Sequence, residues 1–257
     1  MPVSTRTIAG IDLELFEDGS GAPLLLLHAG RGFDARDAYV AGLAKTRRVI
    51  APSHPGFGKS SLPLWLDSVE DIAHVYLELM DALGIARCDV VGCSIGGWIA
   101  AEMATKTPER FNRIVLVGPV GVKTGPADKL DIPDIYAMGQ DKLEPLLMHD
   151  PQRWRRDPAT LSDGELTAMV RNWETLALLT WEPYMHNPKL KHRLHRVKNP
   201  TLFLRGEHDG MISADYLKRY AALLPNARLD TIKAAGHVPH IEQADAFVAA
   251  VTSFLEG

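Results

Sequence analysis

The feature that most constrains the fold is an alternation of short apolar runs with longer amphipathic stretches. The apolar runs have the length of buried strands and are LLLLH at 24–28, RVIAP at 48–52, CDVVGC at 88–93, RIVLVG at 113–118 and TLFLRG at 201–206. In the stretches between them apolar residues recur every three or four positions, as in helices, for example in VEDIAHVYLELMDALG, IGGWIAAEMATKTPERF and ADYLKRYAALLP. This order predicts an α/β fold, a mostly parallel, doubly wound sheet with helices on both faces and a binding crevice at the carboxyl ends of the strands.

Two parts of the chain depart from this alternation. The segment TIAGIDLELFEDGSG alternates apolar and polar residues around Ala9 and Gly10, which predicts a hairpin ahead of the main sheet. The stretch 121–198 has helical patches but no strand pattern, and proline and glycine residues lie near both of its ends. We therefore expect a core made of residues 1–120 and 199–257, with 121–198 inserted as a helical cap.

Composition limits the class of protein. A chain of 257 residues suits one catalytic domain with an insertion, and a net charge of -4 provides no broad attraction to nucleic acid or an anionic membrane. No apolar run reaches the roughly 20 residues that span a bilayer. The segment MPVSTRTIAG lacks the apolar stretch of a signal peptide, so a cytoplasmic location is expected. A homodimer is left open.

The two cysteines, Cys88 and Cys93, lie in one predicted strand. An extended strand holds them too far apart for a relaxed disulfide, so we expect reduced thiols.

The strongest chemical signal is the sequence GCSIGG at 92–97, between an apolar strand and an amphipathic helix. It matches the G-x-S-x-G nucleophile elbow, a strained turn whose glycines remove side chains that would collide with the strand and helix. The turn presents the hydroxyl of Ser94 to the crevice, beside the positive end of the helix dipole. A glycine-rich turn can also serve packing alone, but the flanking elements and the residues downstream favour a nucleophile.

A serine hydroxyl needs a base, and histidine suits this role because its ordinary pKa is about 6.5. His237 follows the predicted strand ARLDTIK and lies at the correct edge of the sheet, whereas its rival His240 falls where the next helix begins. Asp209, in a glycine-flanked turn after TLFLRG, is the expected acid, with Glu207 a less favoured substitute. Along the chain the nucleophile comes first, then the acid, then the base, which is the order required when the nucleophile lies in an elbow of this kind.

An oxyanion hole would complete the site by placing backbone N–H donors around the developing negative charge. We expect one donor to be the N–H of Ile95, directly after the nucleophile. The other is expected from the loop after LLLLH, with Gly30 N–H favoured because glycine permits close approach of the backbone. His28 is expected to hold this loop in shape rather than to act in catalysis.

Taken together, these segments resemble the α/β-hydrolase superfamily from about residue 5 to the C-terminus, the cap being poorly covered. The matching pieces are LLLLHAGRG, RVIAPSHPGFGKSS, VVGCSIGGWIAAEMA, LFLRGEHDG and AAGHVPHIEQADAF. The resemblance implies a catalytic triad of Ser94, Asp209 and His237. One departure is Ala29, where related sequences usually have glycine, and its methyl group is expected to narrow the oxyanion loop slightly.

Serine at position 94 argues against the haloalkane dehalogenases and epoxide hydrolases of the superfamily, which resemble this chain but use aspartate there. It also weakens a likeness to the dienelactone hydrolases, which use cysteine. Cys93 is expected to point into the core with no catalytic part.

Three functions remain open. The favoured one is a serine hydrolase that cleaves a small or medium, largely apolar carboxylic ester or lactone through an acyl-enzyme. The second is a carbon–carbon bond hydrolase similar to the meta-cleavage product hydrolases, indicated by LVGPVGV after the sixth strand and the size of the cap. Such enzymes commonly have tryptophan after the catalytic histidine, where this chain has Val238. The third is a non-catalytic receptor that binds a ligand in the same pocket.

The cap is expected to cover the acyl pocket, and its candidate lining residues are Trp154, Trp173, Trp181, Tyr184 and Met185. Helical periodicity does not decide whether these side chains face a ligand or pack the cap onto the core. Their character favours an apolar small-molecule substrate over a sugar or a phosphorylated compound. No metal or organic cofactor is expected, because the sequence has neither paired histidine motifs nor a Rossmann glycine fingerprint after the first strand.

Overall fold

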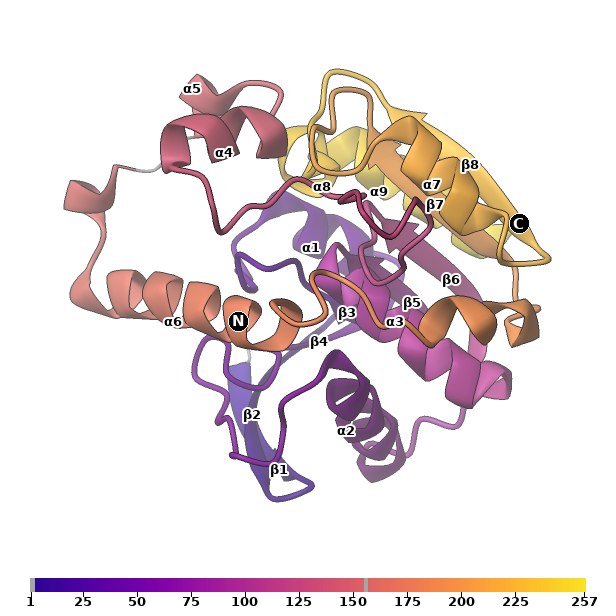
Figure 1. Cartoon of the computed structure of the whole chain (residues 1–257). Helices are drawn as coiled ribbons and strands as arrows, with labels where there is room; N and C mark the ends of the chain where they lie inside the picture. Colours follow the sequence, from indigo (N-terminus) through magenta and orange to yellow (C-terminus); the bar gives the residue numbers. More distant parts are fainter. Residues whose placement is uncertain (1–2, 155–156) are drawn as a thin grey trace.

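An eight-stranded sheet runs through the molecule (Figure 1). The computed structural model describes residues 3–154 and 157–257. The strands follow one another across the sheet in the order β1-β2-β4-β3-β5-β6-β7-β8. Their bounds are β1 Val3–Ile8, β2 Ile11–Asp18, β3 Pro23–Leu27, β4 Arg48–Pro52, β5 Cys88–Cys93, β6 Phe111–Val117, β7 Thr201–Gly206 and β8 Ala227–Ile232.

The pairing of the strands confirms both the N-terminal hairpin and the parallel core. β1 and β2 are antiparallel, and the turn between them has positive φ at Ala9 (52°) and Gly10 (75°). β2 also pairs with β4 in antiparallel fashion, whereas the pairs from β4 through β3, β5, β6 and β7 to β8 are parallel. The carboxyl ends of the parallel strands therefore meet at one edge of the sheet.

Helices cover both faces of the sheet, and this explains why the strand sequences are apolar throughout. In β3, Leu25 and Leu27 pack into the core cluster under α2 and α3, while Leu24 and Leu26 pack into the cluster under α1 and α9. Strands buried on both faces do not need alternating polar residues. The helices of this core are α1 Ala38–Ala44, α2 Val69–Ala82, α3 Ile95–Lys106, α7 Ala214–Ala221, α8 Pro239–Glu242 and α9 Ala244–Glu256.

The segment between β6 and β7 is helical and lies outside the layered core (Figure 1). It contains α4 Gln140–Leu147, α5 Pro151–Trp154 and α6 Asp163–Thr180, together with short 3₁₀ turns, and its described residues form no strand. α6 begins with a capping box in which Ser162 and Glu165 each bind the other's backbone N–H. These features agree with a helical insertion, while its division from the core at 121 and 198 stays a prediction.

The part of the insertion from 121 to 187 begins and ends at one place, beside the end of β6. Gly121 N–H donates to Met185 O at 2.9 Å and Asn187 N–H donates to Gly121 O at 3.0 Å, so that Gly121 and His186 form an isolated parallel bridge. We call these two adjoining ends the cap stem.

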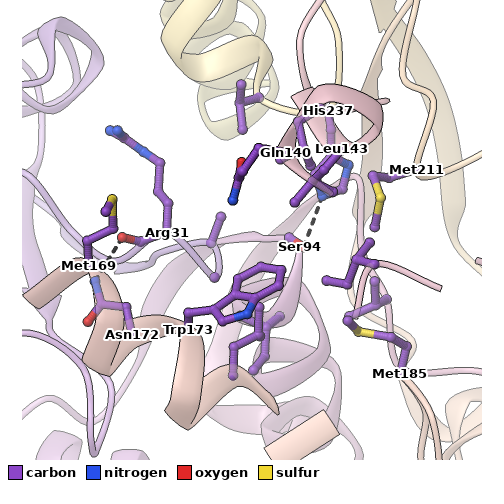
Figure 2. Close-up of a pocket in the computed structure, with 18 of the residues that line it drawn as sticks. Arg31, Ser94, Gln140, Leu143, Met169, Asn172, Trp173, Met185, Met211 and His237 are labelled. Carbon is purple, nitrogen blue, oxygen red and sulfur yellow. Dashed lines mark hydrogen bonds between the residues drawn. The ribbon is translucent and has the colours of Figure 1, made fainter. Parts of the chain in front are cut away.

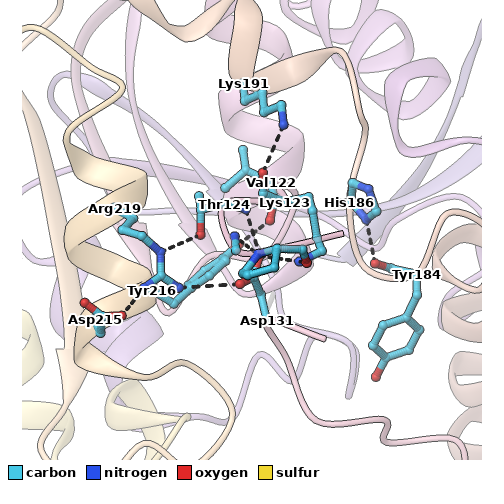
Figure 3. A network of polar contacts seen from close by, with 12 residues as sticks. Val122, Lys123, Thr124, Asp131, Tyr184, His186, Lys191, Asp215, Tyr216 and Arg219 are labelled. Atoms are coloured by element: carbon cyan, nitrogen blue, oxygen red, sulfur yellow. Dashed lines mark hydrogen bonds and ion pairs between the residues drawn. The ribbon is translucent and has the colours of Figure 1, made fainter. Parts of the chain in front are cut away.

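A polar network attaches the first part of the insertion to α7 (Figure 3). The mostly buried Asp131 carboxylate accepts the N–H groups of Thr124 (2.7 Å) and Gly125 (3.0 Å), and it also binds Lys123 Nζ (3.3 Å) and Arg219 of α7 (3.4 Å). Backbone donors and two cations together compensate the cost of burying this charge.

Two further predictions concern the cysteines and membrane-spanning helices. Both cysteines are buried and unpaired, which confirms the prediction of free thiols. Across residues 3–154 and 157–257, no helix combines the length and the apolar character of a bilayer-spanning segment.

Candidate active site

Ser94 lies in a sharp turn between β5 and α3, with φ 55° and ψ -113°. Its N–H donates to Val117 O at 2.8 Å, which fixes the turn to the neighbouring strand β6. A Cβ atom at Gly92 would lie 2.3 Å from Gly96 O, and one at Gly96 would lie 2.3 Å from Leu27 O. Only glycine fits at these positions, so the elbow predicted from the sequence has a steric basis.

Three side chains predicted to act together are joined by hydrogen bonds at the carboxyl edge of the sheet. Figure 2 shows the bond between Ser94 and His237. His237 Nε2 lies 3.0 Å from Ser94 Oγ, and His237 Nδ1 lies 3.0 Å from Asp209 Oδ2. Asp209 Oδ1 accepts the N–H groups of Met211 (2.9 Å) and Ile212 (2.8 Å). Because the carboxylate is held on both sides, Nδ1 of the histidine carries the proton and Nε2 is free to accept the serine proton.

The loop after β6 passes close to Asp209 and His237. Gly118 there has φ 49°, and a Cβ atom on it would lie 3.0 Å from the His237 ring and 3.2 Å from Asp209 Oδ2. A side chain at position 118 would therefore displace this pair.

The rival acid and base are held elsewhere. His240 is buried in α8, where its ring packs against Tyr39 (4.9 Å between centroids) and Phe247 (5.8 Å). Glu207 is exposed, and its carboxylate accepts the N–H of Ala234 at 3.3 Å. No hydrogen bond among the described residues links His240 to Ser94 or Glu207 to His237.

The two proposed oxyanion donors, Gly30 and Ile95, both line the cavity that contains Ser94. Within the described part of the chain neither N–H donates a hydrogen bond, so both are available to a ligand. Gly30 is also packed tightly, since a Cβ atom on it would lie 2.7 Å from the Leu176 side chain of α6.

His28 holds the oxyanion loop, as expected from the sequence. His54 N–H donates to His28 Nε2 at 2.9 Å, so the other ring nitrogen, Nδ1, donates to Ala29 O at 2.8 Å. The two histidine rings stack with centroids 3.6 Å apart, and Tyr76 Oη lies 2.6 Å from His54 Nδ1. Ala29 itself packs in the core cluster under α1 and α9.

Three buried histidines predict a loss of stability in acid. Burial lowers the pKa of His28 to about 4 and holds the pKa values of His54 and His240 well below the ordinary value. The unfolded chain binds these protons at about pH 6.5, so stability is full above that pH and falls as the pH drops towards the folded-state values. His28 alone accounts for about 3 kcal/mol between pH 6.5 and 4.

This prediction can be checked by urea unfolding from about pH 7 down to about pH 5. Nδ1 of His240 has no hydrogen-bond partner in the described structure. In His240→Leu the unfolding free energy should therefore fall less steeply as the pH is lowered, with a slope smaller by the equivalent of about one bound proton. The matched control His192→Gln, at an exposed position, should leave the slope unchanged, and an unchanged slope in His240→Leu would contradict the assignment.

The cavity above Ser94 has a volume of about 630 Å³, and its walls come from the oxyanion loop, the elbow, α4 and α6 (Figure 2). Most of the lining is apolar: Ala29, Ile95, Val120, Ile135, Leu143, Leu147, Met148, Met169, Val170, Leu176, Met211 and Val238. A volume of this size and an apolar wall with few polar groups are typical of small-molecule sites.

Of the five cap residues predicted to line the pocket, the structure brings Trp173 and Met185 to its wall. Trp181 instead is more than half exposed, and its ring packs against Tyr136 at 5.5 Å between centroids. Tyr184 faces away, donating its hydroxyl proton to Pro133 O at 2.6 Å. The side chain of Trp154 lies outside the described residues.

Sequence reasoning missed the polar part of the wall, which is made by Arg31, Gln140, Asn172 and Glu174. Asn172 of α6 donates to Arg31 O at 2.8 Å and accepts the N–H of Gly58 at 2.9 Å, so it fastens α6 to the oxyanion loop. No local pattern marks Asn172, because it meets both partners only after α6 has folded over the core. Among the described residues no group of three or more metal-ligating side chains comes together, and a cofactor-free reaction stays an expectation.

The sheet order and the elbow at the end of β5 define the α/β-hydrolase fold. A family model described as "Alpha/beta hydrolase family" matches residues 24–250, and the chain belongs to this family.

Curated relatives match over nearly the whole chain. The chain is 31% identical over 266 residues to the 2-hydroxymuconate semialdehyde hydrolase of Pseudomonas putida, covering 96% of this chain and 92% of that protein. It is 27% identical over 282 residues to the 2-hydroxy-6-oxo-6-phenylhexa-2,4-dienoate hydrolase of Burkholderia cepacia, covering 98% and 94%. These relatives are hydrolases, so the chain is an enzyme of this class, and they offer no support to the non-catalytic receptor.

Among solved structures, the chain is similar to the enol-lactonase from Burkholderia xenovorans LB400. Its TM-score is 0.79 and its identity 24%, with 99% of this chain and 100% of that chain covered. At this identity the likeness supports the fold alone.

Proposed function

We propose that this hydrolase uses Ser94 to cleave the carbon–carbon bond beside the 6-carbonyl group, an aldehyde or a ketone, of a 2-hydroxy-6-oxo-dienoic acid. The observation that carries the choice of bond is the 31% identity, over 96% of the chain, to a 2-hydroxymuconate semialdehyde hydrolase. The sequence alone favoured an ester or lactone and kept the carbon–carbon bond as the alternative. The names of these relatives support the carbon–carbon alternative.

The substrate reacts as its 2-oxo-3-enoate tautomer, in which the hydroxyl proton has moved to the carbon next to the 6-carbonyl group. The reaction then begins with attack on that carbonyl group. Ser94 Oγ bonds to the carbonyl carbon while His237 Nε2, 3.0 Å away, takes its proton. Asp209 keeps the histidine in the required tautomer and stabilises the imidazolium. The N–H groups of Gly30 and Ile95 bind the oxyanion, a contribution of about 3 kcal/mol for each such donor.

The carbon–carbon bond then breaks. Its electron pair passes to the departing carbon, which in the 2-oxo-3-enoate tautomer is a saturated CH₂ next to the enone, so the pair is delocalised onto the 2-oxo oxygen as a dienolate. The His237 imidazolium then protonates this dienolate, and the product that leaves is a 2-hydroxydienoate. Water attacks the remaining acyl-enzyme with His237 as base, releasing a carboxylic acid and restoring the serine hydroxyl. One water is consumed overall.

Ester or lactone hydrolysis is the second candidate, and the character of the wall favours it. The described lining offers one permanent cation, Arg31, and this side chain already pairs with Asp37. A neutral ester therefore suits the cavity without a further counter-ion. Val238 after the base, where meta-cleavage hydrolases commonly have tryptophan, points the same way.

A direct comparison of substrates separates the two candidates. The purified enzyme is assayed with 2-hydroxy-6-oxohepta-2,4-dienoate, whose cleavage is measured by the loss of dienolate absorbance. In parallel it is assayed with p-nitrophenyl esters of increasing chain length. We expect kcat/KM to be about 100-fold higher for the dienoate, a difference of about 2.7 kcal/mol in transition-state stabilisation. A preference of the same size for an ester would replace the first candidate by the second.

A further inference from the structure

Residues 146–150, which end α4 and follow it, lie against the two loops that carry the acid and the base. Gly210 N–H donates to Leu146 O at 3.0 Å, and His237 N–H donates to Leu147 O at 2.8 Å. The base therefore has its own backbone hydrogen-bonded to the insertion, in addition to its two side-chain bonds.

The buried carboxylate of Glu242, the last residue of α8, joins the same two parts of the chain. Its Oε2 accepts the N–H of Gly236 at 2.6 Å, and Gly236 directly precedes the base. Its Oε1 accepts the N–H groups of His149 at 2.9 Å and Asp150 at 3.1 Å. One side chain thus binds the peptide next to His237 and two peptides of the insertion.

Residues 146–150 and the Gly236 peptide pack directly against each other through backbone atoms. A Cβ atom on Gly236 would lie 2.6 Å from Leu147 O and 2.8 Å from both His149 N and Met148 Cα. The contact leaves no space for a side chain, so any change in the position of residues 146–150 moves the peptide before the base.

Charge explains why a glutamate stands at this position. Glu242 is buried, and the described chain places no cation within ion-pair distance of it. A buried carboxylate is costly unless it is hydrogen-bonded, and charge-assisted bonds to N–H groups are among the stronger ones in proteins. Its partners are three backbone donors, which makes it a clamp rather than a member of an ion pair.

We propose that Glu242 is a positioning residue for His237. Its carboxylate clamps the Gly236 peptide to residues 146–150, so that the base and the cavity wall at Leu147 and Met148 move as one body. The inference rests on the proposed role of His237 as base, but not on which bond the enzyme cleaves.

The test compares Glu242→Gln and Glu242→Ala with Asp245→Asn, a matched change at an exposed carboxylate on the next helix. Substituting Gln keeps the shape but turns an NH₂ group towards backbone donors. We expect kcat to fall about 100-fold in Glu242→Ala, the size of loss that a small misplacement of a catalytic group produces, and by less in Glu242→Gln. KM should change little, and Asp245→Asn should behave as the parent.

A second readout distinguishes positioning from loss of fold. The rate at which a fluorophosphonate labels Ser94 depends on activation by His237 but not on substrate recognition, so it should fall in parallel with kcat. Thermal unfolding midpoints show that the variants are folded. If Glu242→Ala does not fold, Gly236→Ala, whose Cβ atom displaces residues 146–150, should show the same fall in kcat and in labelling rate.

Two results would overturn the inference in different ways. The first is that folded Glu242 variants keep the parent's kcat and labelling rate, whether or not their KM is raised. This result would exclude a positioning role and leave Ser94 as nucleophile. A parent enzyme that the fluorophosphonate does not label would remove the proposed function, and the positioning role with it.

Discussion

Replacing Ser94 by alanine is expected to lower kcat by about 10⁵- to 10⁶-fold, the size of loss that follows removal of a serine nucleophile. The variant loses the atom that bonds to carbon, and His237 Nε2 loses the hydroxyl that it faces at 3.0 Å. Residual turnover would come from the oxyanion donors and substrate binding. Single-turnover and steady-state kinetics on the preferred substrate measure the effect.

The structure should survive this change. The Ser94 side chain caps no helix N–H, and the turn itself is held by the backbone bond to Val117 and by its glycines. Ser253→Ala, at an exposed position of α9, is the matched control and should keep the parent's kcat. A Ser94→Ala protein that turns over substrate at a rate close to the parent's would refute the nucleophile assignment.

The second large effect is expected from Asp209→Asn, with a fall in kcat of about 10⁴-fold. The amide oxygen can still accept the N–H groups of Met211 and Ile212, so the loop keeps its shape. Its NH₂ group then faces His237 Nδ1, which must become an acceptor, and the proton moves to Nε2. A histidine in that tautomer cannot take the proton of Ser94.

Kinetics of Asp209→Asn beside Glu207→Gln test this assignment. Glu207 lies on the same loop but is exposed and binds only the Ala234 peptide and the neighbouring His208 among the described residues. Its variant should keep the parent's activity. A larger loss in Glu207→Gln than in Asp209→Asn would exchange their roles.

The sheet and the convergence of Ser94, Asp209 and His237 at its edge could be predicted from the sequence because local patterns determine them. Parallel strands buried on both faces produce uninterrupted apolar runs, and the loops that follow such strands meet at one edge. The elbow carries its own signature, since Gly92 and Gly96 are required by contacts within a few residues and with one neighbouring strand.

The cavity wall could not be predicted in the same way. Trp173 and Trp181 are eight residues apart, and at 100° per residue they lie about 80° apart around a helix. Periodicity provides this angle but not the direction of the core, so it could not tell that Trp173 lines the cavity and Trp181 packs on Tyr136. The packing of α6 over the core decides between them.

The contacts of Glu242 also could not be predicted from the sequence. A glutamate at the end of a short helix reads as a surface charge, and the two donors that bury it, His149 and Asp150, lie more than 90 residues earlier. Sequence patterns also do not decide which kind of bond the enzyme cleaves, because the same triad can act on esters and on carbon–carbon bonds.

The cap stem makes the insertion interchangeable in principle. Gly121 contacts Met185 and Asn187 through backbone atoms alone, so the chain between them starts and finishes at neighbouring points. A loop whose ends already meet can be lengthened, shortened or grafted at a small entropic cost, since closure depends only weakly on its length. Exchange of this segment would therefore change the α4 and α6 walls of the cavity and leave the sheet in place, provided that the new segment rebuilds the peptides which Glu242 binds.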